Sequence, residues 1–181
     1  NRAVNYASVM GATNDNPKDA TSFIKNNDFS LGNADGWTCT FKGGTNATNV
    51  GYQSANYTNG DVTINQFIEA WANSAFNSNY TFRALGDAKL SQLMPDLPAG
   101  KYKFTCDAIA NNQDGNADPA TGVKGVELFA LGGSLEAKQS IHTGNGLPEH
   151  FEVIFINPGG DVELGLRTQN TDANWIAADN F

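Results

Sequence analysis

The alternation of side chains along residues 101–110 constrains the fold of this chain more than any other feature. Mostly polar residues alternate there with an apolar series, Tyr102, Phe104, Cys106 and Ala108. A period of two with one mostly apolar face predicts a half-buried β-strand. Residues 95–100 hold two prolines and a glycine, which predicts a turn, and residues 90–94 supply apolar side chains for a shorter strand before it. We therefore expect a strand–corner–strand unit over residues 88–110.

Short period-two segments recur along most of the chain. They predict strands at residues 37–41, 61–71, 126–131, 135–141, 151–156, 162–166 and 175–181, with turns at 132–133 and 157–161. Residues 42–61 are rich in Gly, Asn and Thr and favour one or two loops with a short edge strand, and residues 81–85 fit a short strand or a helical turn. About eight to eleven short strands without helical periodicity predict an all-β, two-sheet antiparallel β-sandwich. We expect residues 1–20 to form an arm or linker and residues 21–181 to form the sandwich domain.

Charge and composition limit the partners of the chain. The formal net charge is −8 and the isoelectric point is about 4.5, so phosphate backbones and anionic membrane surfaces would be repelled. No apolar run approaches the roughly 20 residues of a membrane span, and the first residues lack the apolar segment of a signal peptide. Two cysteines, Cys39 and Cys106, either pair across the sandwich or serve as two small buried apolar residues. Neither has the spacing of a metal site.

Four pieces of sequence stand in a recognisable order. They are Asn26-Asn27-Asp28-Phe29-Ser30 with Gly36-Trp37, residues 93–102 (Leu-Met-Pro-Asp-Leu-Pro-Ala-Gly-Lys-Tyr), residues 126–130, and residues 173–181 (Ala-Asn-Trp-Ile-Ala-Ala-Asp-Asn-Phe). Together they resemble carbohydrate-binding-module-like jelly rolls of the galactose-binding-domain type, over about residues 21–181. Such domains are frequent in secreted and surface proteins of gut Bacteroidetes and are often attached to glycoside hydrolases. The resemblance implies a jelly roll whose first and last strands pair, in a protein that is secreted, periplasmic or on the outer-membrane surface.

The resemblance also implies a structural Ca²⁺ near that strand pairing, held by an early Glu and a late Asp. The late position is Asp179 here, and Ser30 stands at the early position, where it removes one oxygen ligand. Asp28 is two residues away and could substitute. Because Ca²⁺ takes six to eight oxygens, one or two carboxylates do not establish a site. The alternative is that Asp179 caps a turn or bonds to backbone.

Sugar recognition needs aromatic rings that stack on pyranose faces, and amides or carboxylates that bond hydroxyls. Trp71, Tyr52, Tyr57 and Tyr80 lie in or beside Asn-rich segments, and Asn116 lies in the polar loop 111–122. We expect these five residues to contact a ligand, although Trp71 could instead pack in the core or fill a sheet edge. Trp37 and Trp175 stand beside strands in the family pattern, which favours structural roles for both.

We expect a non-catalytic carbohydrate-binding module that binds a poly- or oligosaccharide and is joined to other domains of a longer protein. The alternative is a structural or adhesive sandwich that mediates protein interactions without a sugar ligand. An enzyme is not expected, because Ser140 and His142 lack a strained nucleophile turn. The strand carboxylates Glu127, Glu152 and Glu163 do not by spacing define a glycosidase pair.

Overall fold

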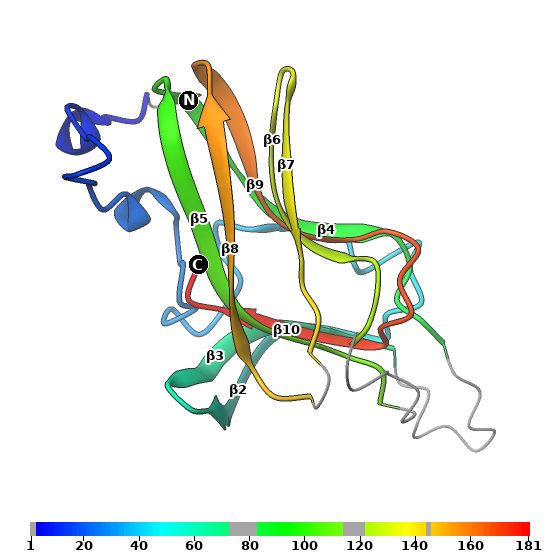
Figure 1. Ribbon diagram of the computed structural model, residues 1–181. Coiled ribbons are helices and arrows are strands. Elements are labelled where there is room, and N and C mark those ends of the chain that lie inside the picture. Colours follow the sequence, from blue (N-terminus) through cyan, green and yellow to red (C-terminus); the bar gives the residue numbers. More distant parts are fainter. Residues whose placement is uncertain (1–2, 73–82, 114–121, 144–145) are drawn as a thin grey trace.

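The computed structural model describes residues 3–72, 83–113, 122–143 and 146–181. Two antiparallel sheets of five strands each face one another, and the long strands β5 and β8 extend to one end of the molecule (Figure 1). Regular helix among the described residues is confined to two 3-10 turns, η1 (Ala7–Val9) and η2 (Thr21–Phe23). The expected all-β, two-sheet sandwich is therefore confirmed. No helix in the described part of the chain is long and apolar enough to cross a membrane.

The first sheet has the strand order β1-β4-β9-β6-β7. Its strands are β1 (Thr38–Cys39), β4 (Ala88–Leu97), β9 (Gly160–Thr168), β6 (Val126–Gly132) and β7 (Leu135–Ser140). The second sheet has the order β2-β3-β10-β5-β8. Its strands are β2 (Asn49–Asn59), β3 (Val62–Trp71), β10 (Trp175–Asp179), β5 (Gly100–Asn111) and β8 (Glu149–Asn157).

The strand–corner–strand unit is present and links the two sheets. β4 lies in the first sheet and β5 in the second, and only Pro98 and Ala99 separate them. Pro95 and Asp96, expected in the turn, instead lie within β4 at a register shift, where Asp96 has a φ of 50°. The buried side chain of Asn157 donates to the carbonyl of Leu97 at 2.8 Å and so holds the corner closed.

The core lies between the sheets and is filled by alternate residues of the strands. The inward series of β5 predicted by the sequence is present: Phe104, Cys106 and Ala108 are buried in the core, and Tyr102 packs against it half-buried. Both cysteines are free, so the cross-sandwich disulfide is not formed. Burial raises the pKa of the Cys106 thiol far above its usual value, which makes this thiol an inert apolar residue.

An aromatic cluster joins the early and late motifs of the sequence. The ring of Phe181 lies 4.6 Å from that of Trp37 and 6.3 Å from that of Phe29, measured between centroids. The backbone N–H of Phe181 donates to the carbonyl of Asn27 at 2.9 Å. The two ends of the domain therefore meet through side chains and one backbone hydrogen bond.

The expectation that the first and last strands pair is wrong. β10 lies between β3 and β5, whereas the two-residue β1 pairs with β4. Residues 26–30 form turns, because Asn26 and Phe29 both adopt positive φ. The side chain of Asn26 supports this turn by donating to the carbonyls of Asn33 and Asp35.

Other strand boundaries also differ from those expected. β2 runs over eleven residues, where one or two loops with a short edge strand were expected. The sequence did not predict its length, because β2 lies at the edge of the sheet and is polar and exposed along much of its length. The strands expected at 37–41 and 175–181 are shorter, at 38–39 and 175–179. Residues 83–85 belong to no strand or helix, and residues 81–82 lie outside the described residues.

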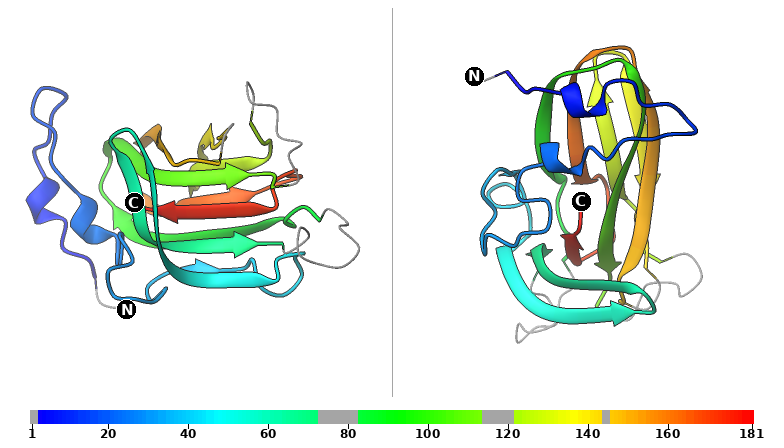
Figure 2. Two further views of the ribbon diagram at one scale, coloured as in Figure 1. Left: turned by 90° about the horizontal axis from the view of Figure 1, so that it is seen from below. Right: turned by 90° about the vertical axis from the view of Figure 1, so that its left-hand side faces the viewer.

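The N-terminal arm packs along one side of the sandwich and does not join either sheet (Figure 2). Tyr6 anchors it, because its ring lies 4.8 Å from that of Phe23 and its hydroxyl donates to the carbonyl of Pro95 at 2.8 Å. The side chain of Gln92 on β4 accepts from the N–H of Lys25 at 3.1 Å and donates to its carbonyl at 2.6 Å. The Tyr6 contacts hold the arm against β4, and the Gln92 contacts hold the first residues of the domain against the same strand.

Candidate functional site

The outer face of the second sheet carries a row of residues in register across four strands. Asn49 of β2, Trp71 of β3, Trp175 of β10 and Asn111 of β5 are successive Cα partners. Side chains of directly paired residues project to the same face of a sheet. The two tryptophans are therefore neighbours on the face that points away from the core.

Trp175 belongs to a second apolar cluster that is separate from the main core. Its buried members are Ile64, Phe67, Ile109, Trp175 and Ala177, and Tyr57 and Trp71 pack against them half-buried. The ring of Tyr57 lies 5.5 Å from that of Trp175 and 5.8 Å from that of Phe67. The outer face therefore presents two partly exposed aromatic rings over a buried aromatic floor.

The hairpin formed by β2 and β3 curves across this outer face (Figure 2). The register between the two strands shifts between Ser54 and Tyr57, which marks a bulge where the hairpin bends. At its tip, the side chain of Asn59 donates to the carbonyl of Pro148 before β8, at 3.2 Å. The bend brings Tyr57 over Trp175 and encloses one side of the aromatic cluster.

A carboxylate lies beside the aromatic rings. Glu69 accepts a hydrogen bond of 3.0 Å from the indole nitrogen of Trp175. Burial raises the pKa of Glu69 above its usual value, while hydrogen bonds from Trp175 and Gln53 act in the opposite direction. Its Cα partner on β2 is Gly51, where an added Cβ would meet no atom within 4 Å. Open space therefore lies next to Glu69, whose carboxylate is hydrogen-bonded by Trp175 and Gln53.

The structure brings together only some of the residues expected to bind a ligand. Tyr57 and Trp71 share the outer-face cluster. Tyr52 lies on the opposite face, where it pairs with Ile68 and packs against the main core. Tyr80 and Asn116 lie outside the described residues.

Sequence reasoning did not select Glu69, Gln53 or Trp175 for this site. The period-two series Phe67, Glu69 and Trp71 placed Glu69 on the same face as Trp71, and this signal could have identified it. Trp175 could not have been paired with Trp71 in this way, because their contact depends on the insertion of β10 between β3 and β5.

Asp179 is 1% exposed and ends β10. Its carboxylate accepts from the backbone N–H groups of Asn180 at 2.7 Å and Asn65 at 3.4 Å. Burial raises its pKa to about 6, and the nearby charge of Asp28 acts in the same direction. The carboxylate thus holds the start of β3 against the end of β10.

The hydrogen bonds of Asp179 and Asp28 determine whether their carboxylates are available to the expected calcium ion. The N–H groups directed at Asp179 compete with a cation for the same oxygens, and Asp28 accepts from the N–H of Ser30 at 3.1 Å. No group of three or more His, Cys, Asp or Glu side chains suited to a metal occurs among the residues that the structure describes. The oxygens of Asp179 and Asp28, both hydrogen-bonded to backbone N–H groups, do not fit a carboxylate-rich calcium site. Calcium binding at these two residues stays a prediction that this geometry does not support.

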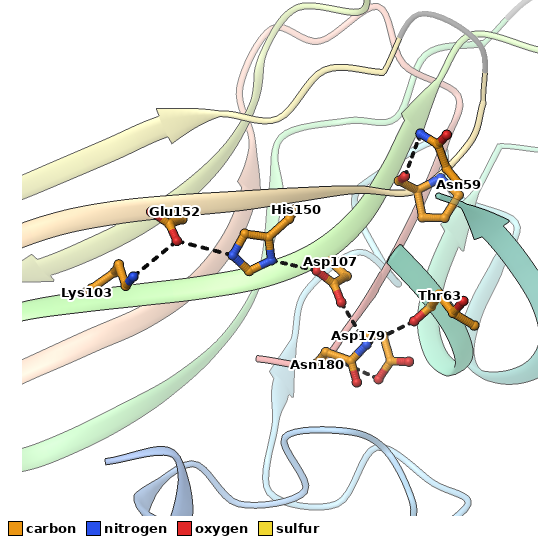
Figure 3. A network of polar contacts seen from close by, with 9 residues as sticks. Asn59, Thr63, Lys103, Asp107, His150, Glu152, Asp179 and Asn180 are labelled. Carbon is orange, nitrogen blue, oxygen red and sulfur yellow. Dashed lines mark hydrogen bonds and ion pairs between the residues drawn. The ribbon is translucent and has the colours of Figure 1, made fainter. Parts of the chain in front are cut away.

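A chain of polar contacts follows the outer face from β8 to β3 (Figure 3). His150 lies between two carboxylates, with Nδ1 at 2.8 Å from Asp107 and Nε2 at 3.3 Å from Glu152. Asn180 donates to Asp107 at 2.9 Å and to the carbonyl of Thr63 at 3.1 Å. The Lys103 ammonium holds the pKa of Glu152 below its usual range. Because both ring nitrogens of His150 face carboxylates, neither is placed to activate a hydroxyl or a thiol.

The other strand carboxylates are held in ion pairs on the first sheet. Glu127 lies 2.9 Å from the Nε of Arg167 and 3.7 Å from the Nζ of Lys138, and Glu163 lies 2.7 Å from the Nζ of Lys89. Each of these carboxylates is therefore part of an ion pair with a cationic side chain of the same sheet.

No protein-family model matches the chain, and no curated protein matches it in sequence. Solved structures share its fold. The carbohydrate-binding module TmCBM61, in complex with β-1,4-galactotriose, superposes with a TM-score of 0.57 at 18% identity, covering 87% of this chain and 94% of that one. A CBM4 carbohydrate-binding module superposes with a TM-score of 0.51 at 13% identity, covering 87% and 96%.

Catalytic proteins share the fold as well. A cyclase from Fischerella sp. TAU, in complex with 4-(1H-indol-3-yl)butan-2-one, superposes with a TM-score of 0.53 at 17% identity, covering 87% of this chain and 92% of that one. At these identities the likeness shows the fold alone. The fold is the jelly-roll sandwich of carbohydrate-binding modules, and it hosts both binding and catalysis.

Proposed function

We propose that this chain is a non-catalytic carbohydrate-binding module that binds a poly- or oligosaccharide on the outer face of the second sheet. The observation that carries the proposal is the grouping of the half-buried Trp71 and Tyr57 with Glu69 and Gln53. An aromatic ring can stack on the apolar face of a pyranose, and a carboxylate and an amide beside it can bond its hydroxyls. The carbohydrate-binding modules among its structural neighbours support this assignment.

The proposed ligand is an uncharged or weakly charged glycan. The net charge of −8 opposes polyanionic polymers, including nucleic acid. The affinity of one such face for a few sugar units would be modest. A module joined to a glycan-degrading or surface protein would gain retention on a polymer through multivalency. The resemblance of its sequence motifs to modules of gut Bacteroidetes is the basis for our proposal that it belongs to a secreted, periplasmic or outer-membrane surface protein, with other domains of that protein as partners.

The second candidate is a structural or adhesive sandwich without a sugar ligand. One observation favours it: the hairpin tip covers part of the outer face, and Trp175 is only 7% exposed. In that case the aromatic cluster would act as a small second core that holds the hairpin in place. Substitution at Trp71 separates the two candidates, because only a binding role predicts loss of retention from a folded protein.

The experiment is affinity electrophoresis on plant and host polysaccharides, with calcium and with a chelator. Wild-type protein should be retarded by at least one polysaccharide class, and Trp71→Ala should abolish that retardation while circular dichroism and the thermal midpoint show a folded domain. Tyr52→Phe is the matched control, because Tyr52 lies on the core side of the same sheet and should leave retardation unchanged. Unchanged retardation of Trp71→Ala would remove the outer face as the site. Absence of retardation on every polysaccharide would favour the structural sandwich.

A further inference from the structure

The edge strand β2 carries a notch on the outer face of the second sheet (Figure 2). Gly51 is the Cα partner of Glu69 on β3 and therefore lies on the same face. Residues two positions apart in a strand share a face, so Asn49 and Gln53 flank Gly51 at about 7 Å on either side. Both flanking side chains are exposed. A Cβ at Gly51 would meet no atom within 4 Å, so the space between them is open.

The backbone keeps this notch free of a side chain. Gly51 adopts a φ of 148°, a conformation that residues with a Cβ rarely adopt. The notch at Gly51 is therefore bounded by the backbone of β2, by the amide side chains of Asn49 and Gln53, and by the carboxylate of the neighbouring strand. The half-buried ring of Trp71 is the diagonal neighbour of Gly51, about 7–8 Å away between backbone positions.

The carboxylate of Glu69 has acceptor positions left for a ligand. It accepts from the indole nitrogen of Trp175 at 3.0 Å and is hydrogen-bonded by Gln53. A carboxylate offers about four acceptor positions, so about two remain. No Lys, Arg or His in the described part of the chain forms an ion pair with it. Burial raises the pKa of Glu69, which means that the two donors compensate its ionised form incompletely.

The chemistry of the notch favours a cationic group over a neutral hydroxyl. An ammonium group brings three donors and a positive charge, whereas a hydroxyl brings one donor. Glu69 can accept one of these hydrogen bonds, and the amide oxygens of Asn49 and Gln53 can accept the other two. The ring of Trp71 adds attraction, because an aromatic face draws cations. The net charge of −8 attracts a cationic ligand at longer range.

We propose that the notch at Gly51 binds the protonated amino group of an amino sugar whose ring stacks on Trp71. The diagonal spacing of the two residues lets a pyranose on the indole direct one ring substituent over the notch. This inference rests on the carbohydrate-binding proposal. It narrows the ligand to a glycan that carries free amino groups.

The test compares two oligosaccharides that differ only at this nitrogen. Isothermal titration calorimetry at pH 6 and physiological ionic strength measures binding of the β-1,4-linked glucosamine tetramer and of its fully N-acetylated counterpart. Acetylation removes the charge and leaves one N–H donor on each sugar unit. Wild-type protein should bind the glucosamine tetramer about tenfold more tightly, or better, since charge-assisted hydrogen bonds are lost on acetylation.

Three variants locate the effect. Glu69→Gln keeps the shape of the side chain and removes its charge, and it should weaken binding of the glucosamine tetramer by about tenfold. Glu136→Gln is the matched control, because it removes the same charge from an exposed position on β7 of the other sheet, and it should change the affinity less than about twofold. Trp71→Ala should abolish binding of both tetramers. Tetralysine, a cation without a sugar ring, should bind far more weakly than the glucosamine tetramer.

The outcomes separate this inference from the function on which it rests. Equal affinity of the wild-type protein for the two tetramers, or equal losses in Glu69→Gln and Glu136→Gln, would overturn the assignment of the amino group. Tetralysine binding as tight as that of the glucosamine tetramer would overturn it too, because the site would then recognise a cation without a sugar. In each case the carbohydrate-binding proposal stands if a neutral polysaccharide retards the wild-type protein and does not retard Trp71→Ala. If no saccharide binds, both proposals fail.

Discussion

The indole N–H of Trp175 donates a hydrogen bond of 3.0 Å to the carboxylate of Glu69 on the neighbouring strand. This bond satisfies a polar group inside an apolar cluster, and it holds the carboxylate of Glu69 on the same face of β3 as Trp71. Leaving one partner of a buried hydrogen bond unsatisfied costs about 1–3 kcal/mol. The pair therefore links the stability of the outer-face cluster to the chemistry of the candidate site.

Substitutions at Glu69 separate these two roles. Glu69→Ala should lower the free energy of unfolding by about 1–3 kcal/mol, because the indole N–H of Trp175 loses its acceptor. Glu69→Gln retains an acceptor oxygen and should lose clearly less. Urea unfolding at pH 7 measures both. Equal losses for the two variants would mean that the hydrogen bond is not what Glu69 contributes.

Asp179 should make stability depend on pH in the mildly acidic range. The folded state raises the pKa of its carboxyl from 3.8 to about 6, so the folded protein binds more protons than the unfolded chain between these values. The free energy of unfolding therefore decreases as pH rises through this window, by about 2 kcal/mol after screening by solvent is allowed for.

Asp179→Asn cannot titrate and should lack this decrease. Urea unfolding of both proteins from pH 4 to pH 7 measures the difference in slope. Asp19→Asn is the control: a hydrogen bond from Thr21 lowers the pKa of that exposed carboxyl, so its titration lies below this window. Parallel pH profiles for wild-type and Asp179→Asn protein would show that Asp179 does not titrate there.

Two glycines in strands should respond very differently to an added methyl group. A Cβ at Gly165 of β9 would lie 2.1 Å from the carbonyl oxygen of Leu90 on β4, and backbone cannot move aside without breaking the sheet. Gly165→Ala should lower the free energy of unfolding by about 2–4 kcal/mol. A Cβ at Gly100 of β5 would meet only the ring of Tyr102 at ordinary contact distances, from 3.6 Å. Gly100→Ala should change stability by less than about 0.5 kcal/mol, and thermal unfolding of both variants checks the contrast.

The strands that the sequence predicted well are those with one buried face. Side chains along β5 and β8 alternate between the core and solvent, so apolar and polar residues alternate in their sequences with a period of two. β2 lacks that alternation: Ser54, Ala55 and Asn56 in its middle are all exposed, and the segment reads as a loop. Its extended conformation depends on pairing with β3, which no local pattern reveals.

The candidate site was predictable only where it follows one strand. Trp71 and Tyr57 were identifiable as aromatic residues near polar segments. Tyr52 has the same kind of neighbours in sequence, but it pairs with Ile68 and its side chain packs against the main core, on the opposite face of the sheet from Trp71. Trp175 reaches Trp71 because β10 is inserted between β3 and β5, which is a property of the whole topology. The sequence motifs also included three aromatic residues of the core, Phe29, Trp37 and Phe181. Their contact could not be predicted, because it arises from turns at Asn26 and Phe29 and not from the expected strand pairing.

The contact between Gln92 of β4 and Lys25, near the start of the domain, gives a prediction that can be checked at two pH values. The buried side chain of Gln92 both accepts from and donates to the backbone of Lys25. Gln92→Glu has nearly the same shape, but its carboxylate cannot donate and would lie against the Lys25 carbonyl oxygen. At pH 7 the variant should be less stable than wild type by about 2–3 kcal/mol.

This deficit should shrink in acid. The buried position raises the folded pKa of the introduced carboxyl above its unfolded value, and a protonated carboxyl can again donate to the Lys25 carbonyl. The stability lost at high pH is therefore regained as pH falls through the folded pKa. Urea unfolding of wild-type and Gln92→Glu protein at pH 4 and pH 7 measures the difference at each pH, which removes the contribution of Asp179 common to both. A deficit of the same size at both pH values would show that the lost hydrogen bond to the Lys25 carbonyl is not what destabilises the variant.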